Sequence, residues 1–209
     1  MAPIIEVSNE TLRTLNPKVY TLRTGLANSK GDGSLIHVPS INTDVPRERT
    51  HQGKNWYQAH KSLAAEGSRM LTPKEYVEFL KYSKENVPEV YEDATAVRNP
   101  WRAEWLDAFF EKGEDGIYIL TRNKTEAEKL SEDTLMEDKR ISRASWLENP
   151  TEQGLPRTDV KEGSLSYWYP RDGAVAWSFA NSVRSYFNCD RDPSNRNSDL
   201  GVRASKKRE

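Results

Sequence analysis

Hydrophobic residues at helical spacing predict a first helix near residue 54. In "KNWYQAHKSLAAEG", Trp56, Ala59 and Leu63 recur at intervals of three and four, and Gly67 marks an end. We therefore expect a helix over 54–66 that buries one face.

The residues that begin "TPKEYVEFLKYSKEN" predict the start of a second helix. Thr72 is a typical N-cap residue, Pro73 suits the first helical position, and Glu75 completes a capping box. We expect this helix over 72–85.

The middle of the chain gives weaker patterns. In "NPWRAEWLDAFFEKGEDG", Trp101, Trp105 and Phe109 stand four residues apart, which predicts a shorter helix. "GIYIL" is predicted to be a buried strand by its β-branched and aromatic residues. The charged residues 123–163 are predicted to form a surface helix and loops inserted into the domain.

Short β-like runs occupy both ends of the chain. Residues 1–50 contain "PIIEV" and "SLIHVPSI", and the last third contains "SLSYWYP", "AVAWSFA" and "LGVRAS". The length of 209 residues suits one domain over 1–209. We expect an α+β fold in which two helices pack on a small twisted antiparallel sheet.

Composition excludes several classes of partner. The net charge of −1 gives no electrostatic case for nucleic acid, and no run of eighteen apolar residues predicts insertion into a membrane. The first residues, "MAPIIEVSNETL", lack the features of a secretory signal. We therefore expect synthesis in the cytoplasm, and any display outside a cell must use another route.

The sequence contains no catalytic constellation, and we predict no cofactor and no metal. Its histidines, His37, His51 and His60, have no metal-motif spacing, and His60 lies on the apolar face of the first helix. The many carboxylates follow helix-surface patterns. Cys189, the only cysteine, has no histidine in its half of the chain and is interpreted as a structural thiol.

The order of motifs resembles the formylglycine-generating-enzyme branch of the C-type lectin fold. That branch shows a "W-x-x-A" helix, then "RLPTEAEWE", and closes with a "G-F-R" strand. The matching residues here are Trp56, Ala59, Arg69, Leu71, Thr72, Pro73, Glu75, Gly201, Val202 and Arg203. The likeness covers residues 50–205. It implies a C-type lectin core with inserts, in which the N-terminal segment pairs with the closing strand around Val202.

The C-terminal residues 176–205 resemble the variable region of proteins diversified by retroelements. Such systems miscopy adenines, so scrambled Asn codons never yield Lys, Glu, Gln, Met or Trp. Those five types supply 46 of the 209 residues, so residues 178–205 should hold about six, and they hold none. The resemblance therefore implies that this segment varies.

Alternation divides this segment into two sets of residues. Ala180, Ser182, Ser185, Phe187, Cys189, Arg191, Pro193, Ser198 and Leu200 form the expected fixed framework. The positions between them form the expected ligand-binding display set: Phe179, Asn181, Val183, Arg184, Tyr186, Asn188, Asp190, Asp192, Asn195, Asn197 and Asp199. From Tyr186 to Asp192 the alternation is strict, as expected where one face of a strand is scaffold and the other is displayed.

We therefore expect a non-enzymatic binding protein that is virion-associated or surface-displayed. Its display set combines aromatic anchors with adaptable hydrogen-bonding residues, as paratopes do. The expected ligand is a protein or a glycan on a cell surface. Two alternatives stay open: an oxidase relative within the same branch, although its cysteine pair is missing, and a structural virion or assembly subunit.

Overall fold

The computed structural model describes residues 35–122 and 126–208. The chain divides into two units, Met1–Ile36 and His37–Glu209, and nearly all described residues belong to the second. The strand expected at "PIIEV" lies outside the described residues, and a single domain over 1–209 stays a prediction.

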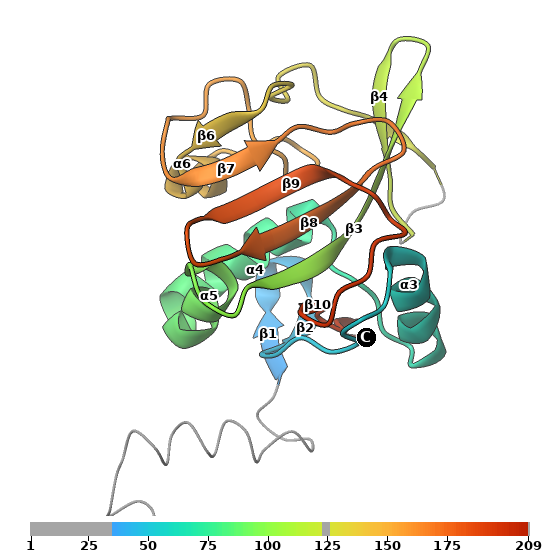
Figure 1. Ribbon diagram of the computed structural model, residues 1–209, viewed down its shortest axis with the longest axis vertical. Helices are drawn as coiled ribbons and strands as arrows, with labels where there is room; N and C mark the ends of the chain where they lie inside the picture. The colour runs from blue at the N-terminus through green and yellow to red at the C-terminus, as the bar shows by residue number, and fades with distance from the viewer. Residues whose placement is uncertain (1–34, 123–125, 209) are drawn as a thin grey trace, which may run out of the picture. The chain divides into compact units, whose positions relative to one another are not determined.

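An eight-stranded mixed sheet forms the centre of the second unit (Figure 1). Its path runs β5 (Glu128–Lys129), β4 (Gly116–Leu120), β3 (Arg102–Gly113), β8 (Val175–Ala180), β9 (Ser185–Arg191), β7 (Leu165–Trp168) and β6 (Lys139–Ile141). The eighth strand, β10 (Leu200–Gly201), pairs with β3 in parallel, and β7 pairs with β9 in parallel. The sheet is therefore larger than expected and is not purely antiparallel.

A second sheet joins the two ends of the described chain. Its order is β1 (Leu35–Val38), β2 (Thr43–Pro46) and β11 (Lys206–Lys207), with the 3-10 turn η1 (Pro39–Ile41) between its first two strands. Next to it, Thr50 and Val202 exchange backbone hydrogen bonds of 2.8 and 2.9 Å. A Cβ atom on Gly201 would lie 2.8 Å from the Thr50 carbonyl oxygen, so this approach requires glycine. The predicted pairing around Val202 is confirmed.

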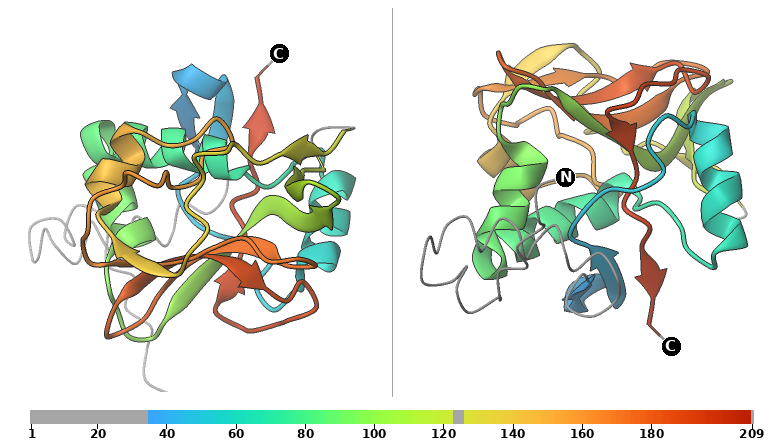
Figure 2. Two further views of the ribbon diagram at one scale, coloured as in Figure 1. Left: turned by 90° about the horizontal axis from the view of Figure 1, so that it is seen from above. Right: turned by 60° about the horizontal axis from the view of Figure 1, so that its bottom comes forward.

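The described helices are α3 (Trp56–Ala65), α4 (Pro73–Asn86), α5 (Pro88–Thr95) and α6 (Arg143–Glu148). The first two confirm the predicted helices. Thr72 and Glu75 form the predicted capping box of α4, and Asn55 and Gln58 form one at α3. Figures 1 and 2 show α4 and α5 behind the sheet, on the side away from the viewer of Figure 1. The unit is thus an α+β fold.

The helix predicted around residues 99–116 is wrong, because this segment forms the central strand β3. Every residue from Arg102 to Ala108 is buried, including the charged Glu104 and Asp107. A strand covered on both faces shows no alternation, so the four-residue spacing of its aromatic residues was misleading.

The segment predicted as a surface insert also contributes to the core. Its described part contains β5, β6 and α6, and buries Leu130, Ile141 and Trp146, among others. The helix α6 is not a surface helix, because Trp146 and Leu147 are both buried. Isolated apolar residues in a charged background take core positions here without regular spacing. The predicted strand at "GIYIL" is confirmed as β4, but only Ile119 is buried.

Candidate binding face

The strand β9 separates its side chains by period two. Ser185, Phe187 and Cys189 are buried, while Tyr186 and Asn188 are partly exposed. Phe187 stacks on Trp146 and Tyr167, with ring centroids 4.4 and 6.0 Å apart. The predicted inward direction of Phe187 and Cys189 is confirmed.

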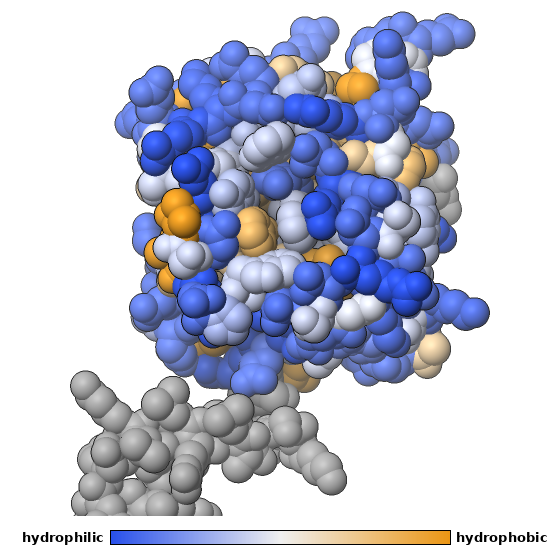
Figure 3. Space-filling view, in the orientation of Figure 1, coloured by the Kyte–Doolittle hydropathy of each residue, from blue (hydrophilic) through white to orange (hydrophobic). Residues whose placement is uncertain are grey.

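Register and contacts identify which face of the sheet lies away from α4 and α5. On β8, the Ser178 hydroxyl accepts a hydrogen bond of 2.9 Å from the Tyr76 hydroxyl of α4, so Ser178 faces the helices. Its neighbours Trp177 and Phe179 therefore point to the opposite side. We call this side, over β7, β8 and β9, the front face. Figure 3 shows near-neutral and hydrophobic side chains in its middle, surrounded by hydrophilic ones.

Aromatic rings pack edge to face and face to face on the front face. Phe179 lies opposite Tyr186, and Trp177 lies opposite Asn188. The rings of Trp177 and Phe179 are parallel within 3°, with centroids 5.1 Å apart. Tyr186 and Trp101 contact Phe179 at centroid distances of 4.9 and 5.2 Å. These contacts give the front face an ordered aromatic centre.

Strict alternation ends at the last residues of β9. The register shifts between Val175 and Trp177 of β8, so Val175 pairs with Arg191. This β-bulge returns Arg191 to the front face, where its guanidinium lies 4.5 Å from the Trp177 ring centroid. Arg191 also donates a hydrogen bond of 3.3 Å to Asn195. Arg191 therefore does not point inward as Phe187 and Cys189 of the framework set do.

The loop from Asp192 to Asp199 is held by its backbone. The carbonyl oxygens of Pro193 and Asn197 accept from Trp56 N and Gly53 N at 3.1 and 3.0 Å. The carbonyl oxygen of Asp199 accepts from Ala103 N at 3.0 Å, and also from Arg49. On the loop's side these bonds are made by main-chain atoms of Pro193, Asn197 and Asp199, so they do not depend on the side chains of those three residues.

Three residues of the display set use their side chains to shape turns. Asn181 Oδ1 accepts from the backbone N–H groups of Val183 and Arg184 at 2.9 and 3.0 Å. Asp192 accepts from Ser194 N, and Asn197 accepts from Asp199 N. The hydrogen bonds to Ser194 lower the pKa of Asp192. These three positions have a structural role that the sequence pattern did not reveal.

None of the eleven display residues is buried. Val183, Arg184 and Asp192 are exposed, Val183 by 70%. The partly buried ones are Phe179, Asn181, Tyr186, Asn188, Asp190, Asn195, Asn197 and Asp199. The structure brings them together on β8, β9, the turn between them and the loop after β9.

Sequence reasoning missed other residues of the front face. Trp168 of β7 lies opposite Asn188 and is 38% exposed, and Arg171 packs beside it, 6.0 Å from its ring centroid. Ser166 lies two residues earlier on the same side, since Tyr167 points into the core. The alternation of "SLSYW", in which Ser166 and Trp168 flank the buried Tyr167, carries this signal in the sequence.

Asp190, at the edge of this face, lies in surroundings that raise the pKa of its carboxyl group. Burial raises its pKa, and the nearby Asp138 adds to the rise, while Arg171 opposes it. Arg171 in turn binds Asp138 at 2.8 Å. Asp190 therefore keeps its proton to a higher pH than an exposed aspartate.

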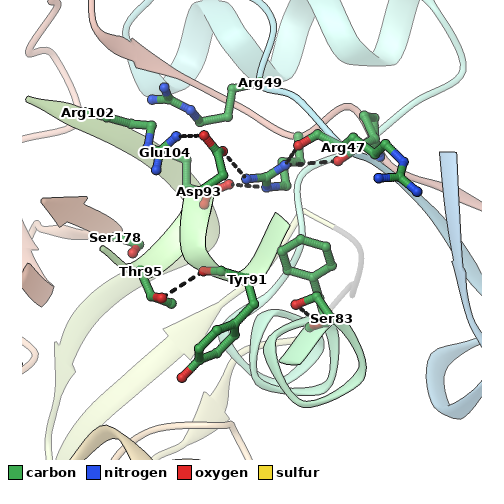
Figure 4. A network of polar contacts seen from close by, with 12 residues as sticks. Arg47, Arg49, Ser83, Tyr91, Asp93, Thr95, Arg102, Glu104 and Ser178 are labelled. Carbon is green, nitrogen blue, oxygen red and sulfur yellow. Dashed lines mark hydrogen bonds and ion pairs between the residues drawn. The ribbon is translucent and has the colours of Figure 1, made fainter. Parts of the chain in front are cut away.

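Behind the sheet, buried charges join several segments (Figure 4). Arg203 Nε lies 3.0 Å from Glu104 Oε2, and its Nη2 lies 3.4 Å from Asp93. Burial of Asp93 would raise its pKa, but Arg102, Arg203 and other cations lower it. Burial lowers the pKa of Arg49, in the same group, to about 10. This network is a structural clamp.

The motif residues behind the lectin resemblance also have structural roles. Arg69 makes a two-pronged ion pair with Glu75 at 2.6 and 2.7 Å, and Glu75 completes the cap of α4. Trp56 is buried and donates its Nε1–H to the Leu106 carbonyl oxygen at 2.8 Å. These residues hold segments of the fold together.

Groups with catalytic potential are placed for packing. Cys189 is fully buried, and burial raises its thiol pKa well above the usual range. His60 packs its ring edge to face against Trp56, and its Nε2 lies 3.2 Å from the buried Asp107. Within residues 35–122 and 126–208, no group of three or more His, Cys, Asp or Glu side chains is arranged to hold a metal ion.

Comparison with known proteins found no matching family model, curated protein or solved structure. Over the described residues, no helix is both long and apolar enough to cross a membrane.

Proposed function

We propose that the chain is a non-enzymatic binding protein with a C-type lectin fold, whose front face is diversified by a retroelement. The face recognises a protein or glycan ligand on a cell surface, as part of a virion or a displayed assembly. The observation that carries the proposal is the match between the division of residues 178–205 expected from the sequence and the burial of their side chains. The residues expected to vary avoid the core, and the buried residues of this segment lie outside the display set.

The chemistry of the front face supports recognition. Phe179 and Tyr186 supply rigid aromatic area, while Arg184, Asn188 and Asn195 supply hydrogen-bonding groups. Such residues dominate binding energy in protein interfaces and paratopes. The backbone bonds that hold the loop after β9 would let this chemistry change without a change of fold.

Burial of Cys189 argues against the oxidase alternative. A redox or copper site needs an accessible thiolate, whereas this thiol is fully buried and its pKa is raised. The structural-subunit alternative would require the front face to be covered by another subunit.

The genome around the gene gives the sharpest test of diversification. We expect a nearby reverse transcriptase gene and a second copy of the segment that encodes residues 178–205, differing from the first at adenines. A neighbourhood with neither feature would contradict retroelement diversification.

Thermal unfolding tests the division into display and framework residues. Replacing Arg184, Tyr186 and Asn188 together by Ala should leave the melting temperature nearly unchanged, since surface changes cost about 0.5 kcal/mol or less. The matched core variant Phe187→Ala should lose roughly 3–5 kcal/mol, because Trp146 and Tyr167 would border a cavity. If the triple variant melts far below Phe187→Ala, the assignment of faces is reversed.

A further inference from the structure

Besides Nε of Arg191, three hydrogen-bonding atoms on the front face have no hydrogen-bond partner among the described residues. They are Ser166 Oγ on β7, Trp177 Nε1 on β8 and Asn188 Oδ1 on β9. Ser166 and Trp177 are only 6% and 5% exposed. Buried polar groups in folded proteins nearly always have a partner, so each of these atoms needs an explanation.

The three side chains lie on the same side of three neighbouring strands, with Ser166 opposite Tyr186 of β9. Asn188 of the central strand β9 lies directly opposite Trp177 on one side and opposite Trp168 on the other. Ser166 precedes Trp168 by two residues and therefore points to the same side of β7. We call Ser166, Trp177 and Asn188 the polar row.

The hydrogen-bond donors and acceptors of the polar row complement those of an uncharged amide group. The indole N–H of Trp177 donates only, the Asn188 carbonyl oxygen accepts only, and the Ser166 hydroxyl does both. A peptide or carboxamide group offers a carbonyl oxygen and an N–H group side by side. A carboxylate would offer no donor to Asn188 Oδ1.

Ring packing distinguishes an amide from a sugar ring, which would bind here by placing its C–H groups on a free aromatic face. Phe179 stacks on Trp177 from one end of β8, and Arg191 reaches Trp177 from the Val175 end. Two neighbours therefore already pack against the Trp177 ring.

We propose that the polar row binds an amide group of a partner protein, and that Arg191 acts as a movable cover over it. This inference rests on the proposed function, and it selects a protein over a glycan as the ligand. The Arg191 guanidinium lies over the Trp177 ring and donates a hydrogen bond of 3.3 Å to Asn195. Arg191 can therefore swing away at the cost of few contacts.

The test follows the indole N–H resonances of the six tryptophans in isotope-labelled protein. Trp177→Phe assigns the Trp177 resonance; if that variant does not fold, Asn188→Asp assigns the Asn188 side-chain amide, which reports on the same place. The probe is N-methylacetamide, with sodium acetate and methyl glucoside as matched probes. We expect N-methylacetamide alone to move the Trp177 resonance saturably, and the resonance of Trp146, whose Nε1–H is bonded to Gly154, to stay in place.

Variants sharpen the result. Ser166→Ala should weaken binding of N-methylacetamide about threefold to tenfold, as expected for one lost hydrogen bond. Ser182→Ala, at an exposed position of the β8–β9 turn, should leave it unchanged. Arg191→Ala should strengthen binding, because the cover is gone.

Three outcomes would overturn the amide proposal. They are a shift caused by methyl glucoside and not by the amide, an equal shift of all indole resonances, and no shift with any probe. None of these outcomes would change the genomic and thermal tests, so failure of the proposed function stays distinguishable.

Discussion

At the scale of single residues, neighbours on β9 have opposite environments. Phe187 lies between two aromatic rings of the core, whereas Asn188 belongs to the front face. This division could be predicted from the sequence, because side chains of a strand alternate with period two. The position of Arg191 could not, since the bulge that turns it outward depends on how β9 aligns with β8.

Cys189 gives a prediction at this scale. Burial raises its thiol pKa, so the fraction of reactive thiolate is very small at neutral pH. A thiol reagent such as Ellman's reagent should therefore leave the native protein unmodified at pH 8, and should label one thiol per chain in denaturant. Rapid labelling of native protein would contradict the buried position and reopen the oxidase alternative.

At the scale of elements, local signals and tertiary environment contribute differently. The helices α3 and α4 were predictable because their capping residues are encoded within one turn of the sequence. The strand β3 was not, since it carries Glu104 and Asp107 in the core and their partners come from distant segments. On β7 the alternation of "SLSYW" shows that Ser166 and Trp168 share a face, but the parallel pairing that places them beside β9 could not be predicted from it.

The turn between β8 and β9 gives a prediction for this scale. Asn181 Oδ1 accepts two backbone hydrogen bonds, and Ala cannot replace either of them. Asn181→Ala should therefore cost about 1–2 kcal/mol of unfolding free energy, measured by urea denaturation. The exposed neighbour provides the control, and Ser182→Ala should change stability by less than about 0.5 kcal/mol. Equal effects of the two substitutions would show that the Asn181 side chain does not stabilise the turn.

At the scale of the whole unit, Arg203 joins segments that are distant in sequence. It donates to the carbonyl oxygens of Pro46 and Arg47, pairs with Glu104 of β3, and lies 4.9 Å from the Phe79 ring centroid of α4. The closing segment is thereby fixed to the helix layer and to the sheet. The loop from Asp192 to Asp199 lies between β9 and this closing segment. The clamp therefore holds the C-terminal end of that loop.

Replacing Arg203 gives a prediction at the scale of the whole unit. Arg203→Ala leaves Glu104 buried without its cation and should cost about 3–5 kcal/mol, whereas the exposed control Arg196→Ala should be nearly neutral. Combining Arg203→Ala with Glu104→Gln should recover part of the loss, since it removes the uncompensated charge.

Asp93 of the same network adds a pH dependence to the stability of the fold. Its folded pKa lies below the ordinary 3.8, so its stabilisation is complete above that value and is lost as the pH falls through the folded pKa. Urea denaturation between pH 2 and 6 should therefore show a smaller loss of stability in acid for Asp93→Asn than for the unchanged protein. Equal slopes in acid for the two proteins would show that Asp93 does not contribute to the clamp.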